Sequence, residues 1–388
     1  MHTNVKWKTT LDRGTIWRVL PLGDRLVVGL GGTWRDQNAM WGGPRGQITV
    51  GASDDVGSTI ILDCDGKVVE ELPGIAPIQT RGAQFIGLRG QHEIVLCSSR
   101  GAVEASAEPL DLQHPIRAVA SLGTRVLVMS SEPLTPEQAE ADAPATLRKC
   151  ECVVVDPGLN ACERFRVDEL VMQTASERSL FWHEYGTSTI RRANWLGQNE
   201  AILNLAHPAI EGECKKWVDA HNTLYVKGGH WALSYDYTAD RLLASRLYPP
   251  HVVAAIEPDG RIAWCRAVHG GCCAGPVRRI GDLLVVASGC GGVVSWLNEH
   301  GELVHQSQDK LRKAQLDPIH PTDIEPGPHG CVLAFRSDRL VSFHPDGSEY
   351  VILEMGDATR PTTVTWWEQL GYAICWDDRT ISLIAAGT

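Results

Sequence analysis

Short apolar runs, each ending in a tight polar turn, follow one another along most of the chain, and almost no stretch has a sustained helical period. The clearest unit reads GTIWRVLPLGDRLVVGLGG and, further along, STIILDCDGKVVEELPG. It divides into four predicted strands, with turns at Gly23-Asp24 and Asp65-Gly66. Glycine accepts the positive φ of such a turn at little steric cost. The pattern therefore predicts four-stranded antiparallel units.

The same unit recurs along the chain. HPIRAVASLGTRVLVMSS is followed by CECVVVDPGLNACERF, and TIRRANWLGQNEAILNLA by HVVAAIEPDGRIAWCRAV; two further units begin at VRRIGDLLVV and DIEPGPHGCV. Glycines of the outer hairpins fall at positions 66, 158, 260, 301 and 347, and the gaps of 41 and 46 residues each match one propeller blade. The 92-residue gap predicts an extra blade near residues 82–110. The 102-residue gap predicts one blade interrupted by an insertion at residues 207–250.

The two ends of the chain are expected to share a blade. The last stretch, PTTVTWWEQLGYAICWDDRTISLIAA, supplies three strands, and the N-terminal NVKWKTTL supplies one. Joining them adds a seventh blade to the six between residue 14 and about residue 356, so that no sheet edge is left open at the junction. We thus predict an all-β, single-domain protein over residues 1–388, a seven-bladed β-propeller closed by pairing of the N-terminal strand with the C-terminal blade. Eight blades are the alternative, if residues 207–250 fold as a blade of their own.

The segment AAIEPDGRIAW, residues 254–264, resembles the strand-turn-strand repeat of the pyrroloquinoline-quinone-like propeller superfamily, which is similar in architecture to WD-repeat propellers. Looser copies at residues 61–69 and 341–351 keep the hairpin and lack its tryptophan. The resemblance implies the propeller fold. The superfamily also contains many members that hold no cofactor.

Charge narrows the classes of partner. The formal net charge is −11 and the pI is about 5.7, which disfavours binding to nucleic acid or to an anionic membrane, because both depend on dense cationic faces. The N-terminal MHTNVKWKTTLDRGTIW has no apolar stretch long enough for a signal peptide or a membrane span, so we expect a cytoplasmic protein. Most of the 12 cysteines are then expected to be reduced.

Three long insertions, at residues 33–57, 132–149 and 207–250, are expected to decorate one face of the ring. Long loops on a rigid scaffold are where binding residues concentrate, although such loops are also often tolerated without a function. Aromatic side chains are frequent in protein interfaces. Four tryptophans in these loops are therefore predicted to be exposed and to contact a partner: Trp34, Trp41, Trp217 and Trp231.

Histidines and cysteines in the same region are candidates for a metal site: His221, His230, His269, Cys272 and Cys273. Their irregular spacings match no paired zinc pattern. Quinoprotein dehydrogenases of the resembled superfamily carry a disulfide between adjacent cysteines against their cofactor, so the pair Cys272-Cys273 implies a quinone as a further possibility. A cytoplasmic chain would keep the pair reduced, and the calcium ligands of those enzymes find no counterpart here. We predict no cofactor, with a metal or a quinone as the alternative.

Arginines stand at the start of four predicted inner strands, at Arg18, Arg117, Arg191-Arg192 and Arg278-Arg279. Inner strands line the channel of a propeller, so Arg18, Arg117 and Arg192 are expected to attract a carboxylate, a phosphate or an acidic peptide there. The alternative is that each arginine pairs with an acidic residue of a neighbouring blade, since buried charges are normally paired.

The chain has no glycine-rich phosphate loop, no Gly-x-Ser-x-Gly elbow and no His-Glu-x-x-His helix. Our leading prediction is a non-catalytic binding or scaffold propeller that recognises a protein or peptide partner through its decorated face. The alternative is an enzyme with its site at the channel mouth: a metal-assisted or quinoprotein-like oxidoreductase, or a lyase or hydrolase acting on an anionic small molecule. Its catalytic candidates are His183, His230 and His269.

Overall fold

The computed structural model describes most of residues 5–385. Outside the described residues lie 1–4, 13, 32–33, 37–47, 51–56, 108–109, 123, 133–149, 168–173, 177, 184–186, 195–197, 222–230, 269–273, 289–292, 308–323, 337–338, 355–360, 362, 369, 377–378 and 386–388. The predicted insertion at residues 132–149 falls almost entirely outside this range.

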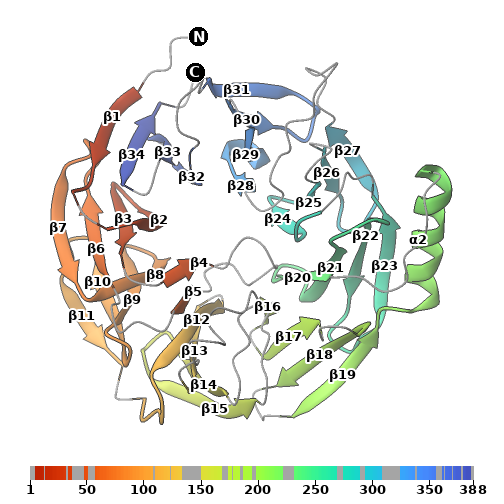
Figure 1. Ribbon diagram of the computed structural model, residues 1–388, viewed down its shortest axis with the longest axis horizontal. Coiled ribbons are helices and arrows are strands. Elements are labelled where there is room, and N and C mark those ends of the chain that lie inside the picture. The colour runs from red at the N-terminus through yellow and green to blue at the C-terminus, as the bar shows by residue number, and fades with distance from the viewer. Residues whose placement is uncertain are drawn as a thin grey trace.

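Eight antiparallel sheets surround a central axis, so the protein is an eight-bladed β-propeller (Figure 1). From the inner to the outer strand, blades one to four are β2 (Ile16–Leu22), β3 (Arg25–Leu30), β6 (Ser58–Leu62), β7 (Val68–Pro73); β8 (Ile75–Arg81), β9 (Gln84–Arg89), β10 (Glu93–Ser98), β11 (Val103–Ser106); β12 (Ile116–Leu122), β13 (Arg125–Ser130), β14 (Cys150–Val155), β15 (Ala161–Val167); and β16 (Thr174–Ala175), β17 (Ser179–His183), β18 (Thr189–Asn194), β19 (Asn199–Asn204). Blades five to eight are β20 (Trp231–Asp236), β21 (Arg241–Arg246), β22 (Val252–Ile256), β23 (Ile262–Ala267); β24 (Arg278–Ile280), β25 (Leu283–Ser288), β26 (Val293–Leu297), β27 (Leu303–Ser307); β28 (Ile324–Pro326), β29 (Val332–Arg336), β30 (Arg339–Phe343), β31 (Glu349–Glu354); and β32 (Thr363–Trp367), β33 (Gly371–Cys375), β34 (Thr380–Ile384), β1 (Val5–Thr10). The described residues also form the helix α2 (Pro208–His221) and the short 3-10 helix η1 (Pro328–Gly330).

The predicted closure of the ring is confirmed. Strand β1 pairs antiparallel with β34, with Trp7 opposite Leu383 and Thr10 opposite Thr380. It is the outer strand of a blade whose other three strands come from the C-terminus (Figure 1). The first and last segments of the chain therefore complete one sheet.

The blade count is eight, the alternative that the sequence left open, and not seven. The two runs assigned to one interrupted blade lie in two: β18 and β19 belong to blade four, whereas β22 and β23 belong to blade five. Residues 207–250 do not form a separate blade; they supply α2 and then β20 and β21. The turn between β20 and β21 has Asp240 at a φ of 48° in place of a glycine, so the usual turn signal is missing there.

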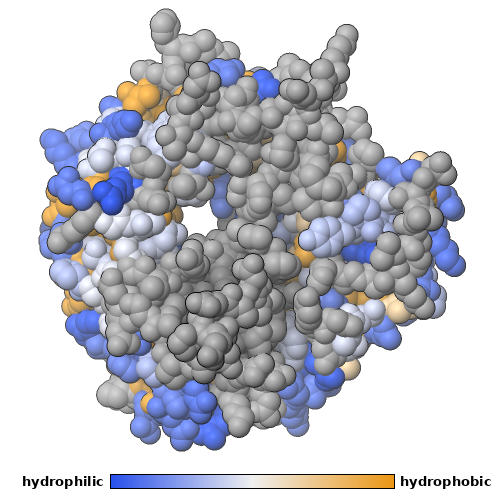
Figure 2. All heavy atoms as spheres, viewed as in Figure 1, coloured by the Kyte–Doolittle hydropathy of each residue, from blue (hydrophilic) through white to orange (hydrophobic). Residues whose placement is uncertain are grey.

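Part of the insertion at residues 33–57 forms a hairpin that reaches blade three. Strands β4 (Trp34–Asp36) and β5 (Ile48–Val50) pair with each other, and β5 pairs with the inner strand β12. The sheet of blade three therefore has six strands and extends toward the middle of the ring (Figure 1). Seen from the same side in the space-filling view, the ring has an opening at its centre, and isolated apolar residues lie around the described part of its rim (Figure 2).

Neighbouring blades are held together by apolar clusters and by two tryptophans on outer strands. Trp264 of β23 donates a hydrogen bond from Nε1 to the carbonyl oxygen of Glu299 in blade six, at 2.8 Å. Trp7 of β1 donates in the same way to Cys64 in blade one, also at 2.8 Å. The hairpin of residues 254–264 that resembled the quinoprotein repeat thus uses its tryptophan to contact the next blade.

No helix in the described part of the chain combines the length and apolar character that crossing a bilayer requires.

Candidate functional site

Helix α2 is a feature of the described part of the rim that a bare propeller does not need. Pro208 stands in the first helical position, where its missing N–H costs nothing. Ile210, Cys214 and Trp217 lie at intervals of four and three, so they share one face, and all three are buried. Ile210 and Cys214 pack into the cluster formed by blades four and five. The helix is therefore packed onto the propeller by an amphipathic pattern.

Two polar contacts fix α2 to the last residue of the outer strand β23 and to the residue after it. The Oε2 of Glu213 accepts a hydrogen bond from the backbone N–H of Ala267 at 2.9 Å. The indole Nε1 of Trp217 donates to the carbonyl oxygen of Val268 at 2.8 Å. Partial burial acts to raise the pKa of Glu213, but Lys216 and the Ala267 N–H outweigh it and hold this pKa below its usual value. Glu213 is thus an ionised residue with both oxygens in use.

A groove of about 590 Å³ lies between α2 and β23, on the outside of the ring. Its helical wall includes Pro208, Gly212 and Lys216, and its other side is formed by residues 260–266. Figure 1 shows α2 beside β23, away from the central channel. The helical wall of the groove is held in place, because the opposite face of α2 is buried against the propeller.

The groove carries positive charge on an acidic protein. Lys216, Arg261 and Arg266 line it, against the single carboxylate of Glu213. The Arg261 side chain is 68% exposed and lies 3.9 Å from Glu257, a weak pair in solvent. Arg266 is exposed and donates to the carbonyl oxygen of its neighbour Cys265 at 2.9 Å. These guanidinium groups are placed to meet an anionic group that enters from solvent.

The predicted tryptophan contacts need correction. Trp217 is only 6% exposed and Trp231 only 4%, so neither is a surface residue. Trp217 is on the inner face of α2, and Trp231 begins the inner strand β20. Trp34 lies on β4, where its side chain is not described, and Trp41 lies outside the described residues.

The predicted arginines do not converge at one place. Arg18 lies on the inner strand β2 and is 7% exposed. Arg117 lies on the inner strand β12, but its side chain is not described. Arg192 lies on β18, the third strand of its blade, so its predicted place on an inner strand was wrong. Its Nε donates to Glu200 at 2.8 Å and its Nη1 donates to the carbonyl of Pro258 in blade five at 2.6 Å.

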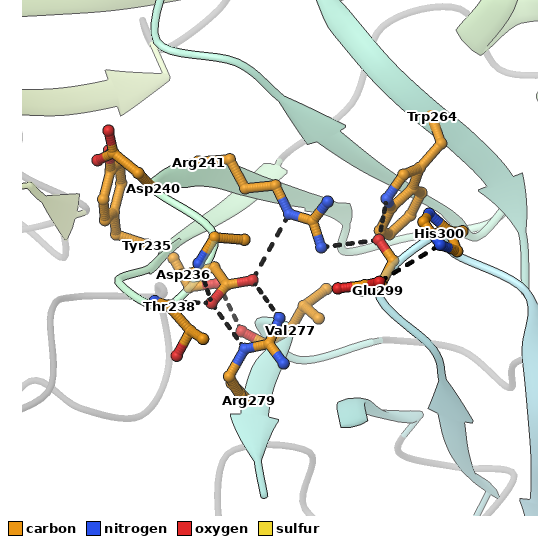
Figure 3. Close-up of polar contacts among 12 residues, drawn as sticks. Tyr235, Asp236, Thr238, Asp240, Arg241, Trp264, Val277, Arg279, Glu299 and His300 are labelled. Carbon is orange, nitrogen blue, oxygen red and sulfur yellow. Dashed lines mark hydrogen bonds and ion pairs between the residues drawn. The ribbon is translucent and has the colours of Figure 1, made fainter. Parts of the chain in front are cut away.

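The alternative, pairing with acidic residues of neighbouring blades, holds for Arg278 and Arg279. Arg278 lies 3.9 Å from Glu325 of the following blade. Arg279 donates from Nε and Nη2 to the two oxygens of Asp236 of the preceding blade, both at 2.7 Å (Figure 3). The Asp236 side chain is fully buried, and Arg241 of its own blade lies 3.5 Å away. The sequence analysis did not identify this carboxylate. Asp236 ends β20, just before the β20–β21 turn, which has no glycine to mark it.

The metal and catalytic candidates stay largely untested. His230, His269, Cys272 and Cys273 lie outside the described residues. His221 stacks on Trp217 with ring centroids 3.9 Å apart, and His183 is buried with Nε2 2.8 Å from the carbonyl oxygen of Thr187. Among the residues that the structure describes, no three His, Cys, Asp or Glu side chains gather as a metal site would require.

Cys150 and Cys152 of β14 are both fully buried, and their Sγ atoms are 3.9 Å apart. Alternation along the strand directs both thiols to one face. The hydrogen bond to Cys150, together with burial, raises the pKa of Cys152. Cys152 is therefore a protonated core residue, packed beside the buried Cys150.

Comparison with solved structures supports the fold. The C-terminal WD40 domain of Sif2 superposes with a TM-score of 0.56 at 11% identity, covering 99% of both chains. The computationally designed protein Ika8 superposes with a TM-score of 0.53 at 10% identity, covering 97% of this chain and 98% of that one. BamB from Moraxella catarrhalis is a looser match, with a TM-score of 0.36 at 14% identity over 89% of this chain and 95% of that one, too low to bear on the fold. No protein-family model matches the sequence, and no curated protein is similar to it.

Proposed function

We propose that the protein is a non-catalytic, cytoplasmic binding module that recognises a protein or peptide partner, and that the groove between α2 and β23 receives part of that partner. The observation that carries the proposal is a groove of about 590 Å³ whose helical wall is fixed to the propeller. Binding to a preformed surface avoids the free energy of ordering it. Trp34 and Trp41, on the insertion at residues 33–57, stay predicted contacts of the decorated face.

The chemistry of the groove favours binding over catalysis. A general acid or base needs a titratable group that is free to exchange a proton with a substrate. Glu213 is the carboxylate in the groove lining, and its oxygens already accept from Lys216 and from the Ala267 N–H. His207 also lines the groove, and its Nδ1 accepts from the Ala209 N–H at 3.2 Å. Lys216, Arg261 and Arg266 are exposed beside the fixed helix α2, which favours recognition of acidic side chains of a partner.

A substitution that fills the groove tests the proposal. Gly212 lines the groove, and no atom lies within 4 Å of the place where its Cβ would stand, so Gly212→Trp adds bulk without a clash against the propeller. Ala220→Trp is the matched control, because Ala220 is exposed on the same helix and does not line the groove. Partners would be captured in cells by proximity labelling with each variant, and folding checked by thermal unfolding.

We expect Gly212→Trp to lose partners that the wild type and Ala220→Trp both retain. An unchanged set of partners for a folded Gly212→Trp protein would refute the proposed function.

A further inference from the structure

We infer that the partner segment in this groove is extended and acidic, about six residues long, and that it pairs along the outer edge of β23. This inference rests on the proposed function and specifies the chemistry of the partner. Residues 260–266 form one side of the groove. The part of β23 in this lining, residues 262–266, spans roughly 15 Å at about 3.3 Å per residue, so a segment of about six residues covers it.

The backbone of β23 offers a free edge for pairing. In the described part of blade five the strand order is β20-β21-β22-β23, with no strand beyond β23. The N–H of Val268 points inward to the carbonyl oxygen of His251, whereas the N–H of Ala267 points outward to Glu213. Because orientation alternates along a strand, the backbone groups of Cys265 also point outward, into the groove.

Glu213 sets one end of this edge. By accepting from the Ala267 N–H, it occupies the place that an added strand would take at that residue. The free part of the edge therefore runs from Cys265 back toward the hairpin turn at Gly260, past a β-bulge at Ala263. Gly212 and Ala263 in the lining have small side chains, which leaves room for a second backbone between helix and strand.

Charge selects an acidic segment. Five outer strands, β7, β11, β15, β19 and β31, each carry at least one glutamate, whereas β23 reads IAWCRA and, like β1 and β27, carries none. Acidic residues on an edge discourage pairing with an acidic strand, and β23 has no acidic residue that would do so. Arg266, now bonded to the carbonyl oxygen of Cys265, can turn to a carboxylate and leave that oxygen to accept from the added strand.

Fluorescence anisotropy with labelled hexapeptides tests each part of the inference. The probe is EVEVEV; KVKVKV reverses its charge, and EVEPPE keeps three glutamates but places two adjacent prolines in the chain. Proline has no N–H to donate, and two adjacent prolines disrupt pairing in either register. The protein is used as wild type, as the double variant Arg261→Glu/Arg266→Glu, and as Arg100→Glu. Arg100 is an exposed arginine beside the outer turn of blade two and serves as the control.

We expect EVEVEV to bind the wild type and Arg100→Glu equally, and KVKVKV and EVEPPE to bind at least tenfold more weakly. The double variant should raise the Kd for EVEVEV by about tenfold, since two exposed ion pairs are replaced by repulsion. An added excess of inorganic phosphate at constant ionic strength should not displace the peptide.

Equal binding of EVEPPE would overturn backbone pairing, and equal binding of KVKVKV would overturn the acidic preference. Displacement by phosphate would indicate a site for small anions instead. An unchanged Kd in the folded double variant, or no binding of EVEVEV at all, would also refute the inference. If EVEVEV fails while Gly212→Trp still loses its partners, the proposed function stands and only this account of the partner is wrong.

Discussion

The indole of Trp7 lies over the turn that contains Gly66, at the junction between the last blade and the first. Its Nε1 donates to the carbonyl oxygen of Cys64 at 2.8 Å, and a Cβ on Gly66 would stand 2.5 Å from the ring. Strand β1 therefore closes the ring in two ways: its backbone completes blade eight, and its tryptophan holds blade one. The same contact joins Trp264 to the turn that contains Gly301.

Replacing Trp7 should destabilise the whole propeller. We expect Trp7→Ala to lower the free energy of unfolding by about 2–3 kcal/mol, because the ring contact and the hydrogen bond are both lost. Val5→Ala on the same strand should cost less than about 1 kcal/mol, since Val5 is 47% exposed. Denaturant unfolding measures both, and a Trp7→Ala protein as stable as the wild type would show that the closure does not depend on this side chain.

The glycine under the tryptophan should tolerate no side chain. Gly66 has a φ of 78°, so Gly66→Ala adds backbone strain as well as a clash with the Trp7 ring. Gly82→Ala adds the strain alone, because Gly82 has a φ of 58° and no atom near its Cβ position. We expect Gly66→Ala to cost at least about 1 kcal/mol more than Gly82→Ala in thermal unfolding. Equal losses would mean that the ring moves aside freely.

Asp236 should make stability depend on pH in the acid range. Burial acts to raise the pKa of Asp236, but the paired guanidinium of Arg279 outweighs it and holds this pKa below its usual value. The folded pKa is thus lower than the unfolded value of about 3.9, so this stabilisation is complete above about pH 4 and is lost as pH falls through the folded pKa.

The variant Asp236→Asn isolates that contribution from other carboxylates with lowered pKa, such as Glu93. The substitution removes the carboxylate that pairs with Arg279. We expect the free energy of unfolding to fall by about 3 kcal/mol at pH 7, and this difference to shrink below pH 4. Urea unfolding of both proteins from pH 7 to pH 2 measures the difference. A difference that stays constant over this range would contradict the role of the charge.

Helix α2 should loosen at its contact with β23 when Glu213 is removed. Glu213→Ala leaves the Ala267 N–H without its acceptor, so hydrogen exchange at Ala267 should rise while the rest of blade five stays protected. The expected loss of stability is about 1 kcal/mol. Lys215→Ala, an exposed change on the same helix, should leave the Ala267 exchange rate unchanged.

The sequence predicted the outer hairpins whose turns contain glycine. The turns at Gly66, Gly260, Gly301 and Gly347 all have positive φ values at glycine, and each joins the strands that the pattern assigned to it. Blades four and five were merged because β16 is only two residues long and the β20–β21 turn relies on Asp240. Non-glycine residues at positive φ give no distinct signal in a single sequence.

The candidate site was less predictable. The spacing of Ile210, Cys214 and Trp217, with Pro208 before them, was a helix signal, but residues 207–250 were interpreted as a loop and its tryptophans as exposed. Burial of a tryptophan depends on which helix face meets the propeller, and that is a tertiary contact. Likewise, the pairing of Arg279 with Asp236 joins residues 43 positions apart in two blades.

Hydrogen–deuterium exchange of the full chain with and without saturating EVEVEV tests the central claim most directly. The account predicts slower exchange in residues 260–266 of blade five and in α2, with the outer strands of the other blades unchanged. Protection confined to other blades or to the channel, with residues 260–266 unaffected, would contradict it.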